Sequence, residues 1–121
     1  MNTPLKVLLV EDSLTQAEFY KETLLAMGVE VHVEHNGQAG LNYAFRYHPD
    51  FIVLDVNLPI MNGIQVCNRL SRASFTQDIP IILLTERTFE SLAGLESVIY
   101  IAKDHDACHH LSKVVEELLQ N

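Results

Sequence analysis

Short continuous runs of apolar residues alternate along this chain with segments in which apolar residues recur every three or four positions. Continuous runs are typical of strands that are buried on both faces of a parallel sheet. The three- or four-residue spacing is typical of amphipathic helices that pack on such a sheet. The runs are rich in Val, Ile and Leu and predict strands at residues 5–10, 29–34, 51–54, 81–84 and 98–102.

The segments between and after these strands predict five helices. The first ends at Gly28, the second covers residues 38–47, and the third covers residues 64–71. The second helix ends at His48, because the residue before a proline avoids helical geometry. A short fourth helix is expected near residues 88–92. The apolar stripes of the first and fifth helices consist of Ala17, Tyr20, Leu24 and Met27, and of Leu111, Val114, Val115 and Leu118.

Five strand–helix units without a visible repeat or linker predict one α/β domain over residues 1–121, with no separate output domain. Right-handed crossovers then give a doubly wound parallel sheet with helices on both faces. We expect the flavodoxin-like (βα)5 fold, whose strand order 2-1-3-4-5 is adopted from the known fold rather than derived from the chain. Ligands of such folds bind beyond the carboxyl ends of the strands, beside the point where the strand order reverses.

Acidic residues outnumber basic ones: 16 Asp and Glu oppose 8 Lys and Arg, and the net charge is −8 at neutral pH. Such a charge repels phosphate backbones and anionic lipids, so we expect neither nucleic acid nor a membrane as a partner. The apolar runs are too short to span a bilayer, and the N-terminus lacks a signal-peptide hydrophobic region, which predicts a cytoplasmic protein. We expect Cys67 and Cys108 to be reduced.

Three carboxylates follow strands that are neighbours in the expected order. Glu11 and Asp12 come directly after the first strand, and Asp55 follows the third. Each taken alone fits a solvated loop residue, and Asp12 or Ser13 would serve as a helix cap. Together they concentrate negative charge in one crevice, which is costly unless a cation neutralises it. Mg²⁺ prefers carboxylate, carbonyl, water and phosphoryl oxygens, so we predict a magnesium site here.

Two further polar residues follow the fourth and fifth strands at the same edge of the sheet, Thr85 and Lys103. A hydroxyl and an ammonium group beside three carboxylates fit phosphoryl transfer. In such a site Asp55 is the nucleophile, and Thr85 and Lys103 hold phosphoryl oxygens. Taken alone, either residue would be an ordinary strand end or an exposed lysine.

Four short motifs of this chain resemble those of the receiver domain of two-component response regulators. The most specific of them is the run D-V-N-L-P-I-M-N-G at positions 55–63. The others are V-E-D-S at 10–13, L-T at 84–85 and Y-I-A-K at 100–103. The resemblance therefore covers nearly the whole chain.

By this resemblance, Asp55 accepts a phosphoryl group from a phosphohistidine of a sensor histidine kinase or a histidine phosphotransfer protein. The resemblance implies that Asp12, Asp55 and the backbone carbonyl of Asn57 bind Mg²⁺ directly. It also implies that Glu11 acts on the ion mainly through water and that Lys103 forms an ion pair with the phosphate.

The resemblance further implies that Thr85 and Tyr100 form a switch pair, in which the hydroxyl moves to the phosphoryl group and the ring swings inward. Phosphorylation then changes the binding of a downstream protein target, which the sequence does not identify. Such a domain is a signalling module and not a turnover enzyme, because its only reactions are its own phosphorylation and dephosphorylation.

Two residues depart from the family pattern. Asp104 stands where the family has a proline joined by a cis bond, and a cis bond without proline costs about 3 kcal/mol. We therefore predict a trans bond, or a strained cis bond held by its surroundings. Glu86 stands where the family has a small residue, and its carboxylate would oppose an incoming anion unless Arg87 or the metal offsets it. Access to Asp55 is therefore expected to be slower or more selective than usual.

The interval between Thr85 and Lys103 is shorter than in the family, and Leu95-Glu96-Ser97 replaces the usual Gly-Ala pair. We therefore expect the fourth helix to be short or irregular. This helix belongs to the usual signalling face of the family, so we expect an atypical partner or the use of another face.

Three other functions are alternatives. A pseudo-receiver would bind partners without phosphorylation, and Glu86 and Asp104 are the residues that favour it. A phosphatase of the haloacid dehalogenase type needs a second acid two residues after the nucleophile, where this chain has Asn57. A flavin carrier needs a phosphate-binding loop at the position of Glu11 and Asp12.

One cluster outside these motifs consists of His105, Cys108, His109 and His110. On a helix, positions 105, 108 and 109 would share one face, which is a spacing compatible with a transition-metal site. A polar helix start with one buried cysteine has the same pattern, and we favour this interpretation.

Overall fold

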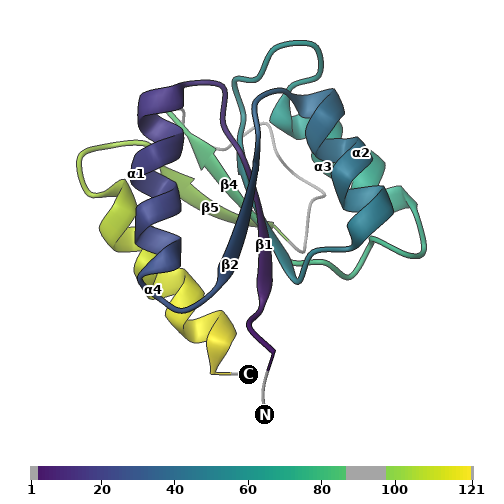
Figure 1. The fold of residues 1–121 in the computed structure, drawn as a ribbon. Coiled ribbons are helices and arrows are strands. Elements are labelled where there is room, and N and C mark those ends of the chain that lie inside the picture. Colours follow the sequence, from purple (N-terminus) through teal and green to yellow (C-terminus); the bar gives the residue numbers. More distant parts are fainter. Residues whose placement is uncertain (1–2, 87–97, 121) are drawn as a thin grey trace.

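The computed structural model of the chain describes residues 3–86 and 98–120. That part of the chain contains five strands and four helices (Figure 1). The strands are β1 (Lys6–Val10), β2 (Glu30–Glu34), β3 (Phe51–Asp55), β4 (Ile81–Thr85) and β5 (Val98–Ala102). The helices are α1 (Leu14–Leu25), α2 (Gly37–Tyr47), α3 (Gly63–Arg72) and α4 (Ala107–Leu119).

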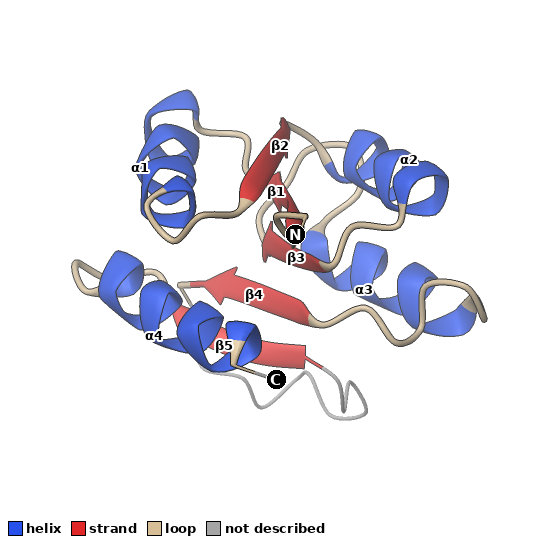
Figure 2. Ribbon diagram, turned by 60° about the horizontal axis from the view of Figure 1, so that its bottom comes forward, coloured by secondary structure: helices blue, strands red, loops and turns tan. Residues whose placement is uncertain are grey.

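The five strands form one parallel sheet in the order β2-β1-β3-β4-β5, which confirms the predicted doubly wound, flavodoxin-like topology. Helices α1 and α4 cover one face of the sheet, and α2 and α3 cover the other (Figure 2). Because every strand runs in the same direction, all carboxyl ends open at a single edge of the sheet.

Side chains of the strands alternate between two hydrophobic cores. In β1, for example, Leu9 packs towards α1 and α4, whereas Leu8 packs towards α2 and α3. This alternation follows from the two-residue period of a strand. A residue just beyond the end of a strand therefore points to the same face as the residue two positions before it.

The predicted strands agree with the structure to within one residue at each end. Helix α1 is shorter than predicted, since it ends at Leu25 and Met27 lies in the following turn. The N–H groups of Met27 and Gly28 donate to carbonyls three residues earlier, each at 3.0 Å. Gly28 has a left-handed φ of 83°, which ends the helix.

The short fourth helix predicted near residues 88–92 lies outside the described residues, so it stays a prediction. The helix labelled α4 corresponds to the predicted fifth helix. None of the helices in residues 3–86 and 98–120 has the length and apolar character needed to cross a bilayer.

Polar side chains and one left-handed residue define three helix ends. The Ser13 hydroxyl caps α1 by accepting a hydrogen bond from the N–H of Gln16 at 3.2 Å, so Ser13 rather than Asp12 is the cap. Asn62 and Gln65 form a reciprocal capping box at the start of α3. α2 ends at Tyr47, as the proline at position 49 predicts, and His48 caps it in a left-handed conformation with a φ of 49°.

Gly37 brings the start of α2 against the loop between β3 and α3. Its N–H lies 3.3 Å from the carbonyl oxygen of Pro59. A Cβ atom at Gly37 would lie 1.6 Å from the carbonyl oxygen of Met61, so no side chain fits without a backbone shift. This glycine therefore fixes the position of a loop that borders the carboxyl end of β3.

We expect Gly37→Ala to lower the free energy of unfolding by about 3 kcal/mol or more, because the backbone of Met61 must move. Gly28→Ala is the control: it has open space but a φ of 83°. Because the backbone at Gly28 is left-handed, we expect Gly28→Ala to lower the free energy of unfolding by only about 1–2 kcal/mol. Urea denaturation followed by circular dichroism measures both losses, and a larger loss at Gly28 would contradict the packing argument.

Candidate functional site

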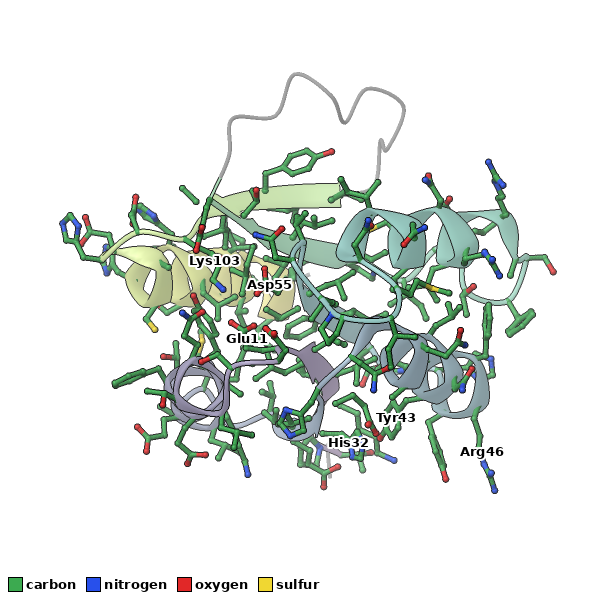
Figure 3. All side chains as sticks on the ribbon, turned by 90° about the horizontal axis from the view of Figure 1, so that it is seen from above. Glu11, His32, Tyr43, Arg46, Asp55 and Lys103 are labelled. Atoms are coloured by element: carbon green, nitrogen blue, oxygen red, sulfur yellow. The ribbon has the colours of Figure 1, made fainter. Side chains whose placement is uncertain are left out.

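Glu11, Asp55 and Lys103 stand at the carboxyl ends of β1, β3 and β5. Two positions earlier in each case, the side chain packs towards α1 and α4, at Leu9, Val53 and Ile101. Since side chains alternate with a period of two, the three polar groups leave the sheet on the same side. Figure 3 shows them pointing towards one another at the edge of the sheet.

The Lys103 ammonium group bridges two buried carboxylates. Its Nζ atom donates hydrogen bonds to Oε1 of Glu11 and to Oδ2 of Asp55, each at 2.8 Å. The side chains of Lys103, Glu11 and Asp55 are 8%, 0% and 4% exposed. The ion pairs therefore lie in a largely water-free place, where their electrostatic interaction is strong.

The pKa of the Glu11 carboxyl group is raised from its usual 4.5 to about 7. Burial is the largest cause, the nearby Asp55 carboxylate adds to it, and the Lys103 ammonium group offsets both only in part. The second oxygen of Glu11, Oε2, is fully buried and has no hydrogen-bond partner within the described residues. A buried oxygen without a partner is costly, so this atom is ready for a proton or a cation.

Burial alone would lower the pKa of the Lys103 ammonium group. The hydrogen bonds that it donates to Asp55 and Glu11 outweigh burial and raise the pKa above its usual value. Lys103 therefore stays charged throughout the physiological pH range and is a permanent hydrogen-bond donor in the site.

Asp12 completes an acidic group at this edge. One carboxylate oxygen each of Glu11, Asp12 and Asp55 lies within 4.8 Å of the others, and Asp12 is exposed. In the ranges that the structure describes, no other three His, Cys, Asp or Glu side chains are close enough to hold a metal ion. The all-oxygen donor set and the unpartnered Oε2 of Glu11 fit a hard divalent cation such as Mg²⁺.

Lys103 offsets part of the negative charge of this acidic group before any metal ion binds. The ammonium group itself neutralises charge on two of the three carboxylates. The sequence did not reveal this, because β5 is separated from β3 by β4 in the sheet. Only the length of the lysine side chain lets it reach both acids.

The loop after β3 wraps closely around Asp55. The backbone N–H of Asn57 donates to Oδ1 of Asp55 at 3.1 Å. The N–H of Gly63 donates to the Val56 carbonyl at 2.9 Å, and a Cβ atom at Gly63 would lie 2.3 Å from the Asp55 carbonyl oxygen. Both carboxylate oxygens of Asp55 are thus oriented, one by Asn57 and one by Lys103.

Thr85 and Tyr100 belong to neighbouring strands. Thr85 ends β4 and is buried, whereas Tyr100 of β5 is half-buried and lies beside Leu83. Leu83 precedes Thr85 by two residues, so Thr85 and Tyr100 point to the face that α2 and α3 cover. Burial raises the pKa of the Tyr100 hydroxyl, which therefore stays protonated at neutral pH.

The two departures from the family pattern lie together at the rim of the site. The Lys103–Asp104 bond is trans as predicted, and the described residues contain no cis bond. Glu86 and Asp104 are exposed and, with Lys103, line a cavity of about 310 Å³ beside α1. The slower or more selective access to Asp55 that these carboxylates suggest stays a prediction.

The cluster of His105, Cys108 and His109 is not among the groups that could hold a metal ion in the described part of the chain. The His105 side chain is 90% exposed and lies 3.4 Å from the Asp106 carboxylate. Cys108 is only half-buried, whereas Cys67 is fully buried in the core beside α3. The interpretation as a polar helix start therefore agrees with the structure, except that Cys108 is less buried than expected.

Because the pKa of Glu11 is raised, its ionisation makes the free energy of unfolding depend on pH. Glu11→Gln cannot ionise and removes this contribution. The unfolded carboxyl group ionises near pH 4.5 and the folded one near pH 7, so the folded chain binds the extra proton between these values. In EDTA, the free energy of unfolding of the wild type should therefore fall relative to Glu11→Gln as the pH rises from about 5 to about 8. We expect a relative fall of up to about 3 kcal/mol.

Urea denaturation of both proteins at several pH values measures this difference. Glu18→Gln is the matched control, since Glu18 is exposed on α1 and should leave the pH profile of the wild type unchanged. Parallel profiles for the wild type and Glu11→Gln would contradict the buried, weakly acidic state of Glu11.

Comparison with known sequences supports the family resemblance. A family model for the response regulator receiver domain matches residues 7–117. The response regulator ArlR of Staphylococcus aureus is 34% identical over 118 residues, which cover 94% of this chain and 49% of that protein. The chain thus spans about half the length of the curated relatives that it matches.

Solved structures give the same result. A putative response regulator from Chloroflexus aurantiacus is 30% identical, with a TM-score of 0.84 over 98% of this chain and 100% of that one. The chemotaxis response regulator CheY4 of Vibrio cholerae is 27% identical, with a TM-score of 0.85 over 95% of this chain and 98% of that one. Together with the matched family model, these similarities show that the chain belongs to the receiver domains of two-component response regulators, which are signalling domains.

Proposed function

We propose that this receiver domain accepts a phosphoryl group on Asp55 from a phosphohistidine of a sensor histidine kinase or a histidine phosphotransfer protein. The observation that carries the proposal is the setting of Asp55. Its carboxylate is buried at a strand end, receives a hydrogen bond from Lys103 at 2.8 Å and lies beside two further acids. A carboxylate with a fixed cation and a divalent-cation site nearby is equipped to act as a phosphoryl acceptor.

The transfer is a substitution at phosphorus. A carboxylate oxygen of Asp55 forms a bond to phosphorus while the phosphorus–nitrogen bond of the donor histidine breaks. The electron pair of the broken bond stays on the imidazole nitrogen, and the donor leaves as histidine. Asn57 and Lys103 orient the two carboxylate oxygens beforehand, so little reorganisation is needed at the moment of reaction.

Asp12, Asp55 and the backbone carbonyl of Asn57 would hold Mg²⁺, and Glu11 would contact the ion through water. When bound, the ion supplies positive charge that offsets the phosphoryl oxygens. The raised pKa of Glu11 means that this carboxyl group shares a proton with the site near pH 7 until a cation arrives.

The new phosphoryl group changes the hydrogen bonds at the edge of the sheet. It would add about two negative charges, and Lys103 and the Thr85 hydroxyl are the groups that we expect to bind them. We propose that Thr85 moves to the phosphoryl group and that Tyr100 turns inward on the face covered by α2 and α3. The two arrangements then differ in their affinity for a downstream protein.

Protein partners are favoured over other classes by the charge of the chain. The net charge of −8 disfavours approach to a nucleic-acid backbone or to an anionic membrane. The domain would therefore act through contacts with its phosphodonor and with a downstream protein.

Incubation with acetyl phosphate and Mg²⁺ tests the phosphoacceptor directly. Intact mass spectrometry should show one added phosphoryl group on the wild type and none on Asp55→Asn. Asp78→Asn is the matched control: it removes an exposed acid far along the chain from the site and should gain the group like the wild type. A wild type that stays folded and gains no mass would contradict the proposal and favour the pseudo-receiver.

Isothermal titration calorimetry with MgCl₂ tests the metal site. Asp12 is exposed and not the helix cap, so Asp12→Asn should leave the fold intact while it removes one ligand. We expect the affinity for Mg²⁺ to fall by about tenfold or more. Asp104→Asn serves as the control, because it changes the charge at the rim without removing a proposed ligand. Equal losses in both variants would show general charge attraction and not a metal site.

A further inference from the structure

The basic residues of this acidic chain are distributed unevenly. Three of its four arginines lie on α2 and α3, and neither helix contains an acidic residue. Helix α1 contains Glu18 and Glu22, and α4 contains Glu116 and Glu117. The two helices that cover one face of the sheet therefore carry three positive charges and no acid, although the net charge of the chain is −8. The three arginines are Arg46, Arg69 and Arg72.

These arginines are exposed and not neutralised within the molecule. All three are solvent-accessible, and none forms an ion pair with another described residue. The guanidinium group of Arg46 lies 5.4 Å from the centre of the Tyr47 ring, which is a cation–π contact. The nearest acid along the chain, Asp50, instead accepts a hydrogen bond from the N–H of Lys6 at 2.7 Å.

Aromatic side chains accompany the arginines. Tyr47 and Phe75 are each 56% exposed, so two large aromatic groups adjoin the arginines. The Phe75 ring lies 5.4 Å from the ring of Phe45, so it is packed against the end of α2. The Tyr47 ring lies 4.6 Å from the ring of Tyr43, which in turn stacks on His32 at 3.9 Å. The exposed rings are thus held in place by other rings.

All three arginines stand in the last turn of their helices, where a positive charge favours the helix dipole. The dipole does not account for the whole pattern, because α1 and α4 end without any basic residue. It also explains neither the lack of acids along α2 and α3 nor the exposed rings of Tyr47 and Phe75.

Helices α2 and α3 lie side by side and both end at the edge of the sheet opposite to Asp55. Figure 3 shows Arg46 reaching outward from the end of α2, well apart from Lys103 and Asp55. We call this surface, consisting of Arg46, Tyr47, Arg69, Arg72 and Phe75, the arginine face. It is separate from the phosphoryl site and does not depend on it.

We propose that the arginine face is a docking surface for an acidic segment of a partner protein. Its positive charge is complementary to such a segment, and complementary charge speeds and orients association. Exposed Tyr and Arg side chains are also the residues that contribute most to binding at protein interfaces. Nucleic acid is disfavoured, because its long and densely charged backbone would extend beyond three arginines and meet the net charge of −8 of the chain, whereas a short acidic segment meets only the arginine face.

The probe for this proposal is a fluorescein-labelled peptide of Glu and Asp residues with a central Trp-Leu pair. Fluorescence anisotropy should show binding that weakens as salt is added, and the same peptide with Lys in place of each acid should not bind. Amide chemical shifts of the ¹⁵N-labelled protein should change mainly at residues 43–48 and 69–76. No binding of the acidic peptide, or shift changes confined to other residues, would overturn the proposal.

A matched pair of variants separates a local surface from overall charge. Arg69→Glu/Arg72→Glu and Lys21→Glu/Lys113→Glu change the net charge equally, but the two lysines lie on α1 and α4. We expect the arginine variant to weaken peptide binding by about tenfold or more. We expect the lysine variant to weaken it by less than about threefold. Equal losses would overturn the proposal.

Two further measurements complete the test. The arginine variant should still gain a phosphoryl group from acetyl phosphate, so that failure at Asp55 and failure at the arginine face are told apart. A DNA duplex and phosphatidylserine vesicles should bind no more tightly to the wild type than to the arginine variant. Tighter, arginine-dependent binding of either would assign the surface to phosphate recognition and overturn the proposal of a protein partner.

Discussion

The bridge from Lys103 to Glu11 and Asp55 is the interaction on which the site depends. Two carboxylates that are 0% and 4% exposed cannot both ionise without a nearby cation, because burial penalises the charged form. The ammonium group donates a hydrogen bond to each carboxylate, and burial makes Glu11 a weaker acid. Asp55 is therefore paired with a cation that is 48 positions away in the sequence.

The parallel sheet makes this bridge possible. The carboxyl ends of β1, β3 and β5 share one edge, and the two-residue period of each strand sends Glu11, Asp55 and Lys103 to the same side. Thr85 and Tyr100 point to the other face. Polar residues at the carboxyl ends of the strands are therefore divided between the two faces of the sheet. The arginine face lies at the far edge and adds a second surface for recognition.

Much of the fold and part of the site were predictable from the residues. All five strands were predicted to within one residue. β1, β3 and β4 are buried on both faces and are therefore almost entirely apolar, whereas the edge strand β2 alternates Val with Glu and His and is only partly buried. The end of α1 was placed too late, because Met27 continues the apolar spacing although the backbone has already turned towards Gly28. The three acids were found as a group only because the strand order was known from a related fold. The ion pairs between Lys103 and these acids were not predicted. Lys103 follows Ile101 by two residues, so the strand period alone gave the face to which its side chain points.

By itself, the sequence determined the alternation of strands and helices, the excess of negative charge, the motifs of the receiver family and the residue types available for phosphoryl transfer. The tertiary structure decided how these residues meet. It showed that Lys103 pairs with two acids, that one oxygen of Glu11 is buried without a partner, and that the exposed arginines gather on α2 and α3. The physical reason is that pattern and charge are properties of local sequence. Desolvation and ion pairing instead depend on distances between segments that are remote in sequence, and folding alone sets these distances.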